Sequence, residues 1–431
     1  MTTTKNNEHK KLNFSSEREQ SQACLNSAEH EKNQGRKVLN VPNLRFPEFQ
    51  GEWKEERLAD IADLYKGTGI SKDQLSDDGE PCILYGELYT KYKSETIREV
   101  ISKTNIDNTK LVRSKANDVI IPCSGETAED IAIARCVLNG NILLGGDLNI
   151  IRLHGYDGAF MSYQLNGRRK YDIAKVAQGV SVVHLYGEHL KGVKTFNPCL
   201  EEQKKIAGLL ALLDERIATQ NKIIEDLKKL KSAIIEKHYS QVKKRTTCIA
   251  DLGEPFSVGS LAKDDLTEIG SPCVIYGELF TTYGEIIFHI ESCTNKTDGM
   301  ILSKKGDLLF PSSTTVDAMS LIAPSVINVD GVVLGGDMFG IHISHNYNAQ
   351  YLSYYFNHIA KKQLAKFAKG STIIHLHYKD IEKAKLLLPS LEEQNRMAKC
   401  LVALDKKASV EQNLLSSLTC QKSYLLQQMF I

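Results

Sequence analysis

The sequence of 431 residues lacks the patterns that usually identify a nucleotide-hydrolysing enzyme, a zinc protein or a membrane protein. It has no GxxxxGKS/T motif, so a phosphate-binding P-loop is not expected. Its ten cysteines are scattered without a CxxC pair, which is typical of reduced thiols and disfavours a structural zinc site. No apolar run approaches the ~20 residues of a membrane span, and the N-terminus has no apolar signal core. We therefore expect a cytoplasmic protein with no metal site and no membrane contact.

A charge of one sign is also missing, because 54 Lys and Arg residues balance 53 Asp and Glu residues. This balance does not indicate a nucleic-acid binder, but a local basic face can exist within a neutral total. The composition, 42% hydrophobic and 25% charged, is that of a globular protein. The length predicts two or three domains.

Repeated polar residues offer only weak candidates for catalysis. His184 and His375 lie in the apolar runs VVHL and IIHL, where contact with a partner is the better interpretation. Glu87 and Glu278 also recur, and we expect them to form structural hydrogen bonds. No cofactor motif accompanies these residues, so no catalytic residue is predicted.

What the sequence does contain is a tandem repeat. YGELYT at 85–90 returns as YGELFT at 276–281, and LGGD at 144–147 returns at 334–337. GVSVVHLYGEHL at 179–190 returns as GSTIIHLHYKDI at 370–381. The offset of about 190 residues is far longer than a solenoid repeat. One domain with its following helix is therefore present twice.

The repeat defines an α+β architecture with two tandem globular domains of mixed α/β structure. Residues 1–40 are polar and predicted to be a disordered tail, with a short docking helix as the alternative. We expect a first domain at 41–198, a central spacer helix at 199–242, a second domain at 243–389 and a C-terminal spacer helix at 390–431.

Both spacer helices carry a coiled-coil heptad pattern, with spacings that alternate between four and three. The first seam comprises 206, 210, 213, 217, 220, 224, 227, 231, 234 and 238, and the second comprises 397, 401, 404, 408, 411, 415, 418, 422, 425 and 429. We expect an antiparallel coiled coil with a pseudo-two-fold axis, although two separate amphipathic helices remain an alternative.

Polar residues interrupt the two seams at matching positions, which are expected to fix the register. We hypothesise that Lys231 faces Glu411 and that Gln220 faces Lys422. About 30 paired residues would span ~45 Å, which exceeds the ~34–36 Å of one DNA turn.

The combined pattern resembles a known family over residues 41–431. LRFPEFQGEW lies at the start of the first domain, and the helix entrances NPCLEEQ and LPSLEEQ close the two copies. This arrangement resembles the specificity subunit of type I restriction–modification systems. The resemblance implies two target-recognition domains that each read one half of a bipartite site on double-stranded DNA, and a chain without catalytic function or cofactor.

The resemblance also implies partners. Two methyltransferase subunits, which would bind S-adenosylmethionine, and two motor-nuclease subunits are expected to supply the chemistry. A coiled-coil protein–protein scaffold with two adaptor domains and no DNA role is the alternative. An enzyme with a duplicated catalytic domain would need a repeated catalytic set beyond the glutamates and histidines named above.

Basic side chains would bind phosphates, and the glycine-led loops at 179–184 and 370–375 could add backbone donors or be ordinary turns. The candidate phosphate contacts are Lys66, Lys91, Lys93, Lys110, Arg113, Lys115, Arg168, Arg169, Lys170, Lys304, Lys305, Lys361, Lys362, Lys366 and Lys369. The candidates in and beside the glycine-led loops are Ser181, His184, Ser371, Thr372 and His375.

Base reading is expected where the two copies differ. Ser124–Cys136 and Ser312–Pro324 diverge between matching flanks, and we predict Thr127, Glu129, Thr314 and Thr315 as DNA contacts within them. Different loops on a shared scaffold predict two different half-sites. The target is then non-palindromic, with a spacer of ~6–8 unread base pairs.

Overall fold

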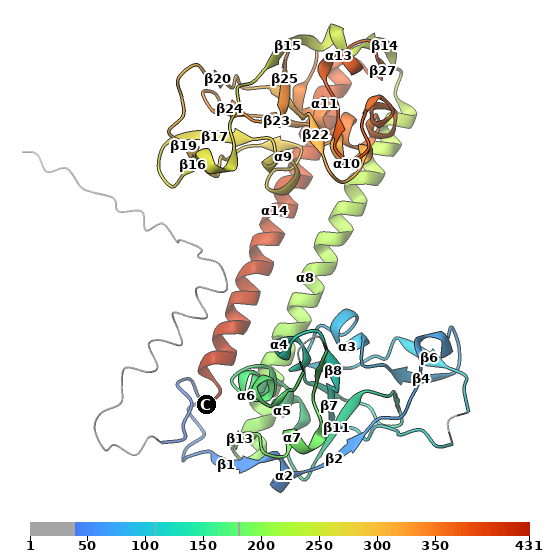
Figure 1. Cartoon of the computed structure of the whole chain (residues 1–431), viewed down its shortest axis with the longest axis vertical. Helices are drawn as coiled ribbons and strands as arrows, with labels where there is room; N and C mark the ends of the chain where they lie inside the picture. Colours follow the sequence, from blue (N-terminus) through green and yellow to red (C-terminus); the bar gives the residue numbers. More distant parts are fainter. Residues whose placement is uncertain (1–38, 108, 180–181) are drawn as a thin grey trace, which may run out of the picture. The chain divides into compact units, whose positions relative to one another are not determined.

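The computed structural model describes residues 39–107, 109–179 and 182–431, so residues 1–38 of the predicted tail lie outside the described residues (Figure 1). The chain divides into two compact units. Unit 1 consists of Met1–Ala211 and Tyr424–Ile431, and unit 2 consists of Leu212–Ser423. Each unit thus holds one copy of the repeated domain and segments of both long helices.

Unit 1 is a mixed α/β domain in which the strand order β2-β11-β7-β9-β5 forms the central sheet and β10-β4-β6-β3 forms a second sheet. Two short pairs, β1-β13 and β12-β8, complete the β-structure. The strands are β1 (Lys54–Arg57), β2 (Ala62–Lys66), β3 (Leu75–Ser76), β4 (Glu80–Ile83), β5 (Thr96–Ile97), β6 (Ser102–Thr104), β7 (Asp118–Pro122), β8 (Ser124–Gly125), β9 (Arg135–Val137), β10 (Leu143–Leu144), β11 (Leu148–Leu153), β12 (Val183–His184) and β13 (Lys194–Asn197).

The helices of unit 1 are short, apart from the one that leaves it. They are α2 (Leu58–Ile61), α3 (Glu87–Thr90), α4 (Ala128–Ile131), α5 (Gly158–Asn166), α6 (Lys170–Val176), α7 (Gly187–Leu190) and the first part of α8 (Leu200–Gln241).

Unit 2 repeats this topology. Its central sheet has the order β15-β25-β21-β23-β18, and its second sheet has the order β16-β19-β17-β24-β20. The strands are β14 (Arg245–Cys248), β15 (Gly253–Ser257), β16 (Leu266–Thr267), β17 (Ser271–Ile275), β18 (Ile286–Ile287), β19 (Ser292–Thr294), β20 (Ile301–Leu302), β21 (Asp307–Pro311), β22 (Ser313–Thr314), β23 (Ser325–Ile327), β24 (Val333–Gly335), β25 (Met338–Ile343), β26 (Ile374–His375) and β27 (Lys385–Leu388). The helices are α9 (Glu278–Thr281), α10 (Ala318–Leu321), α11 (Ala349–His358), α12 (Lys361–Leu364), α13 (Tyr378–Ile381) and α14 (Leu391–Gln428).

The central sheet of each unit is buried on both faces. In β7, Val119 and Ile121 pack with the helices on one face, while Ile120 packs toward the second sheet. In β21, Leu308 packs with the helices and Leu309 toward the second sheet. Successive side chains point to opposite faces of a strand, so these continuous apolar runs belong to strands covered on both sides.

The segment LRFPEFQGEW, residues 44–53, packs within unit 1. Trp53 is buried, with its ring 5.7 Å from Phe160 and 6.4 Å from Phe430. Arg45 forms a bidentate pair with the buried carboxylate of Glu202, at 2.7 Å for each nitrogen–oxygen distance. The glutamine of the first LEEQ motif, Gln203, likewise has a structural role, because its side chain bonds the backbone of residues 157 and 198.

The repeated glutamates of YGEL are structural as well. Glu87 is buried and accepts hydrogen bonds from the Leu84 backbone at 3.0 Å and from the hydroxyl of Ser102. Glu278 does the same in unit 2 with Ile275 and Ser292. Each carboxylate ties the start of a short helix to a neighbouring strand, which confirms the predicted structural hydrogen bonds.

The long helices form the predicted coiled coil. Every position of the two predicted seams is buried or half-buried. Within unit 2, contacts between α8 and α14 run antiparallel, because Asp214 contacts Lys422 whereas Lys231 contacts Asp405. Residues 200–241 of α8 contain no proline and one glycine, Gly208, so the helix can run without interruption.

The predicted pairing of the polar seam residues is wrong. Gln220 bonds Glu411, with its amide 3.0 Å from the backbone carbonyl, and Lys231 bonds Asp405 at 2.8 Å. Lys422 bonds Asp214 at 2.6 Å. The prediction paired seam residues only with one another, whereas the apolar layers set a register that places each seam lysine against an aspartate beside the seam.

These contacts obey the internal symmetry of the chain. Adding 191 to the numbers of Lys231 and Asp214 gives Lys422 and Asp405, so the two ion pairs are equivalent. The same operation exchanges Gln220 and Glu411, whose contact therefore lies on the pseudo-two-fold axis. The axis passes between two polar residues, which can bond only in this register.

Lys231 also joins the helix pair to the domain of unit 2. Its ammonium lies 2.8 Å from Glu285 and 5.0 Å from the ring centre of Tyr354, which donates its hydroxyl to Asp405. Burial opposes ionisation of Glu285, but the bond from His358 and the charge of Lys231 outweigh it and lower the pKa of Glu285 to about 2.

Within the described part of the chain, no helix is both long enough and apolar enough to cross a membrane.

Candidate nucleic-acid interface

In each unit the divergent loop pairs with the glycine-led loop. In unit 2, β22 pairs antiparallel with β26, with Ser313 opposite His375 and Thr314 opposite Ile374. In unit 1, β8 pairs with β12 in the same way, with Ser124 opposite His184. Segments that are about 60 residues apart in the sequence thus form one surface, and both were predicted to contact DNA.

The glycine-led loops are tight turns. Gly370 has φ of 116°, and a Cβ atom there would lie 2.0 Å from the carbonyl oxygen of Ile373. Lys369 and His375 close the turn with reciprocal backbone hydrogen bonds of 2.9 and 2.7 Å. Gly179 has φ of 125° and the same close approach in unit 1. The turn requires glycine for conformational reasons, whereas phosphate binding by these loops stays a prediction.

The turn of unit 2 exposes Ser371, Thr372 and His375, whereas Ser181 of unit 1 lies outside the described residues. His375 stacks on His377 with ring centres 6.1 Å apart, and His184 stacks on Tyr186 at 6.0 Å. Both histidines are exposed. Their contact with a partner molecule stays a prediction.

Each divergent loop contains a helix of one turn, α4 in unit 1 and α10 in unit 2. The residue directly before each helix caps it. Thr127 accepts a hydrogen bond from the backbone of Asp130 at 3.1 Å, and Asp317 accepts one from Ser320 at 2.7 Å. The cap explains the presence of Thr127 without any role in DNA binding. Its spacing from Asp130 is a capping pattern that the sequence could have revealed.

The two loops expose different chemistry. The loop of unit 1 exposes Glu126 and Glu129, whose carboxylates form no ion pair with any residue that the structure describes. The loop of unit 2 exposes Thr315, Val316 and Met319, together with the capping carboxylate of Asp317. Both loops therefore present hydrogen-bond acceptors, and the loop of unit 2 adds exposed apolar side chains.

Several predicted phosphate contacts have partners within their own unit. Lys91 bonds Glu87 at 2.7 Å, and Arg113 bonds Glu80. Arg168 donates to the carbonyl of residue 427, and Arg169 donates to that of residue 431. Lys93 donates to the carbonyl of residue 89. These contacts account for the residues structurally, and their part in DNA binding stays a prediction.

Lys115, Lys304 and Lys305 are exposed but lie away from the recognition loops. Lys115 precedes β7, whereas the divergent loop follows it, and a strand of five residues spans roughly 17 Å. Lys304 and Lys305 have the same relation to β21. Lys366 and Lys369, by contrast, flank the turn beside β26, and Lys369 pairs with Asp380 while remaining largely exposed.

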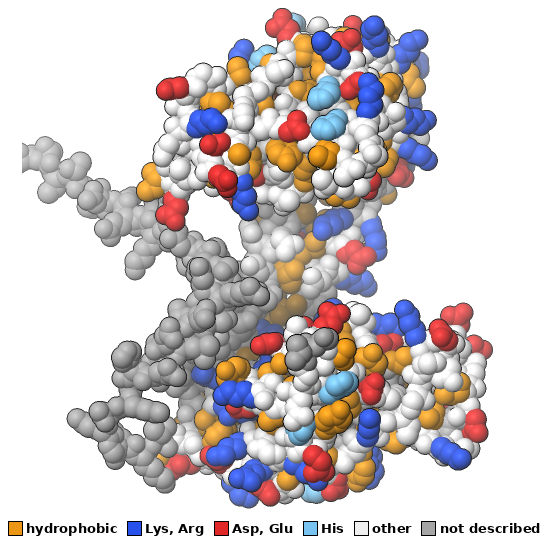
Figure 2. Space-filling view, in the orientation of Figure 1, with side chains coloured by type: hydrophobic (Ala, Val, Ile, Leu, Met, Phe, Trp, Pro, Cys, Tyr) orange, Lys and Arg blue, Asp and Glu red, His pale blue; other side chains and the backbone are white. Residues whose placement is uncertain are grey.

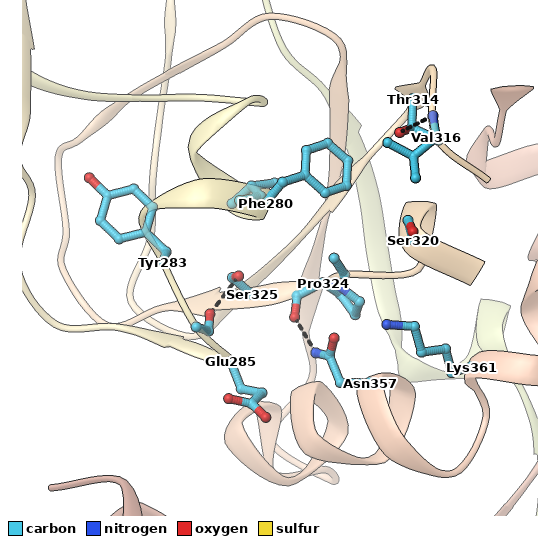
Figure 3. Close-up of a pocket in the computed structure, with 13 residues that line it drawn as sticks. Phe280, Tyr283, Glu285, Thr314, Val316, Ser320, Pro324, Ser325, Asn357 and Lys361 are labelled. Carbon is cyan, nitrogen blue, oxygen red and sulfur yellow. Dashed lines mark hydrogen bonds between the residues drawn. The ribbon is translucent and has the colours of Figure 1, made fainter. Parts of the chain in front are cut away.

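A cavity of about 450 Å³ in unit 2 lies between α9, the divergent loop and the start of α12 (Figure 3). Figure 3 shows Phe280, Val316 and Lys361 turned toward this space from three separate elements. Among the residues that the structure describes, Lys361 forms no ion pair. Figure 2 shows histidine and hydrophobic side chains gathered over the region where Figure 1 labels β22 and α9.

Sequence reasoning did not select Phe280, Val316, Met319 or Ser320 for this surface. Val316 and Met319 lie in the divergent segment, but an apolar residue in a sequence is usually assigned to the core. Phe280 carries a clear signal, because it is the one residue by which YGELFT differs from YGELYT.

No group of three or more His, Cys, Asp or Glu residues able to hold a metal ion occurs among residues 39–107, 109–179 and 182–431.

Known proteins resemble this chain over most of its length. The family model described as the type I restriction modification DNA specificity domain matches residues 50–229 and again 248–419. The type I restriction enzyme MjaVIII specificity subunit of Methanocaldococcus jannaschii is 24% identical over 394 residues, which cover 85% of this chain and 89% of the relative. The putative MjaX specificity subunit of the same organism is 24% identical over 415 residues, covering 86% and 90%.

Solved structures show the same fold. The S subunit of a type I restriction–modification system from M. genitalium aligns with a TM-score of 0.63 at 18% identity, covering 91% of this chain and 99% of that one. A chain from a structure on complex assembly and conformational transition of the type I R-M system aligns with a TM-score of 0.51 at 15% identity, covering 88% and 97%.

Proposed function

This chain belongs to the family of type I restriction modification DNA specificity domains, and we propose that its two units each read one half of a bipartite, asymmetric DNA site. It is a sequence-specific DNA recognition subunit, and its family supplies specificity rather than catalysis. The observation that carries the proposal is the pairing of each divergent loop with its glycine-led turn, β8 with β12 and β22 with β26. One scaffold therefore presents two different loops at the same place.

The chemistry of the loops supports two different half-sites. A carboxylate such as that of Glu129 is repelled by phosphates, but it accepts a hydrogen bond from the exocyclic amino group of cytosine in the major groove. The hydroxyls of Thr314 and Thr315 can donate or accept, and the neighbouring Val316 cannot do either. Loops with different side chains would favour different base pairs, which supports a non-palindromic target.

Phosphate contacts would position each unit on the duplex. Lys366, Lys369, Ser371 and Thr372 surround the turn of unit 2, and cationic and hydroxyl groups are the usual partners of phosphate oxygens. At its pair with Asp380 the Lys369 side chain is 75% exposed, whereas that of Asp380 is 13% exposed and also accepts from the backbone of His377. Lys369 could exchange this partner for a phosphate, since Asp380 would keep its backbone bond.

The chemistry of restriction and modification would reside in partner subunits. We infer two methyltransferase subunits, which use S-adenosylmethionine to methylate adenine, and two motor-nuclease subunits. A spacer of ~6–8 unread base pairs would separate the two half-sites. The polar contacts of the seam support a fixed register of α8 against α14.

Methylome sequencing tests the proposal. A host carrying this chain and its partner methyltransferase should methylate adenines in one motif with two unequal halves and a spacer of constant length. The host without this chain is the control. A continuous motif or a palindromic one would overturn the proposal.

A further inference from the structure

The cavity of unit 2 depends on two residues that differ between the units. In unit 1 the hydroxyl of Tyr89 donates to the carbonyl of Ser124 at 2.9 Å, which ties α3 to the divergent loop. In unit 2 the equivalent residue is Phe280, which has no hydroxyl and lines the cavity instead. The same motif thus braces the loop in one unit and leaves an apolar wall in the other.

A second residue that lines the cavity, Ser325, is also smaller than its equivalent in unit 1. Strand register makes Arg135 of β9 equivalent to Ser325 of β23, since Ile120 lies opposite the first and Leu309 opposite the second. Arg135 is buried and donates to the carbonyls of Tyr92 and Ala134, at 3.1 and 3.0 Å. A serine leaves space where unit 1 places a guanidinium.

Exposed apolar side chains lie in the cavity and in the segments beside it. Val316 lines the cavity and is 72% exposed. Met319, three residues further along the same loop, is 42% exposed, and Ile373 on the paired turn is 49% exposed. Exposed apolar side chains gathered on one surface usually mark a place where a partner is bound.

A cation completes the site. Lys361, at the start of α12, lines the cavity beside Thr314 and Val316. The Glu285 carboxylate also lines the cavity, but it is already bonded to Lys231 and His358. The site therefore combines aliphatic and aromatic carbon with a hydrogen-bond donor. In the major groove, thymine is the base that presents a methyl group next to an acceptor oxygen, O4.

We propose that unit 2 reads thymine, with the 5-methyl group against Val316, Met319 and Phe280 and the O4 atom facing Lys361. The inference rests on the proposed function and goes beyond it, because it names the base and the side chains that select it. The half-site of unit 2 then contains at least one T·A pair that cannot be replaced without loss of affinity.

Deoxyuridine tests this directly, since it is thymidine without the 5-methyl group. The full chain in complex with its methyltransferase would be titrated against duplexes of its own target in which each thymine of either half-site is replaced singly by deoxyuridine. We expect one or more replacements in one half-site to weaken binding about three- to five-fold, as loss of one buried methyl group predicts.

The variants Val316→Ala and Met319→Ala identify the reader. At least one of them should bind the thymine and deoxyuridine duplexes equally, since the group that contacted the methyl is gone. Ile269→Ala is the matched control, because Ile269 is an 85% exposed aliphatic side chain of the same unit on the turn between β16 and β17. It should keep the full preference for thymine.

Three results would overturn the inference while leaving the proposed function intact. They are specific binding with no loss at any deoxyuridine, an unchanged preference for thymine in both variants, and a half-site of unit 2 without a T·A pair. Failure of the complex to prefer any sequence would instead refute the proposed function itself.

Discussion

The two units share a scaffold but not a recognition surface, and their differences are concentrated at a few positions. Glu87 and Glu278 bond the same backbone and hydroxyl partners in each unit. One residue after the shared Leu of the same motif, Tyr89 bonds the divergent loop while Phe280 lines a cavity. The comparison teaches that motifs shared by the two copies make the same structural contacts, while single differences within these motifs change the surface.

Among the substitutions considered, the largest loss of stability is expected at Lys231 of the helix pair. Its replacement by Met leaves the carboxylates of Glu285 and Asp405 without a cation in a half-buried site, which should lower the free energy of unfolding by about 3 kcal/mol. Urea unfolding measures the loss. Lys422→Met removes the equivalent pair with Asp214 and should destabilise in the same direction. Unchanged stability in both variants would contradict the assigned register.

Glu285 should give unit 2 a dependence on acid that can be measured. Its pKa of about 2 in the folded chain lies below the ordinary value of 4.5, so its ionised form stabilises the fold. That contribution is complete above pH ~4.5 and is lost as the pH falls toward 2. Between these limits the wild type should lose on the order of 2–3 kcal/mol more than Glu285→Gln. Parallel curves for the two proteins would refute the buried ion pair.

The turn of unit 2 can be disturbed without changing its polar groups. Gly370→Ala places a Cβ against the Ile373 carbonyl and forces a positive φ on a residue that avoids it, at a cost of about 1–3 kcal/mol. Gly277→Ala is the control, since Gly277 has a helical φ of −63° and open space at its Cβ. Thermal unfolding should separate the two variants, and equal melting temperatures would show that the turn is not strained.

Exchange of Tyr89 and Phe280, the residues that differ between the two YGEL motifs, is expected to change the unfolding free energy least, and it compares the two units at one equivalent position. Tyr89→Phe removes the bond to Ser124 and should cost about 1 kcal/mol of unfolding free energy. Phe280→Tyr removes no bond, so its unfolding free energy should stay near that of the wild type. A loss in unit 2 as large as that in unit 1 would show that the two positions are not structurally different.

The repeat and the helix pair could be predicted because both depend on the spacing of apolar and repeated residues, which the sequence shows directly. The heptad positions are buried or half-buried throughout, and Trp53 packs as an anchor. The pairing of Lys231 could not be predicted from the seam alone. Its partners Asp405 and Glu285 lie beside the seam and in the adjoining domain, and only the packed register brings them together.

The proposed recognition surface could be predicted from the sequence only in part. Divergence between the copies selected two loops, and pairing of β22 with β26 brings Thr314 of one of them beside the glycine-led turn. The exposure of Val316 and Met319 could not be read from the sequence, because burial of an apolar residue depends on what packs over it. The cavity also escaped prediction, since it arises from the joint effect of Phe280 and Ser325.

Transfer of one loop between the units tests the central claim most directly. Replacement of Ser313–Ser325 by the equivalent Ser124–Arg135, together with Phe280→Tyr, would give unit 2 the recognition loop of unit 1. Methylome sequencing of a host that carries this chimera should then show the half-site of unit 1 in both halves of the motif, with the spacer unchanged. An unaltered second half-site in a chimera that still directs methylation would contradict the assignment of base reading to these loops.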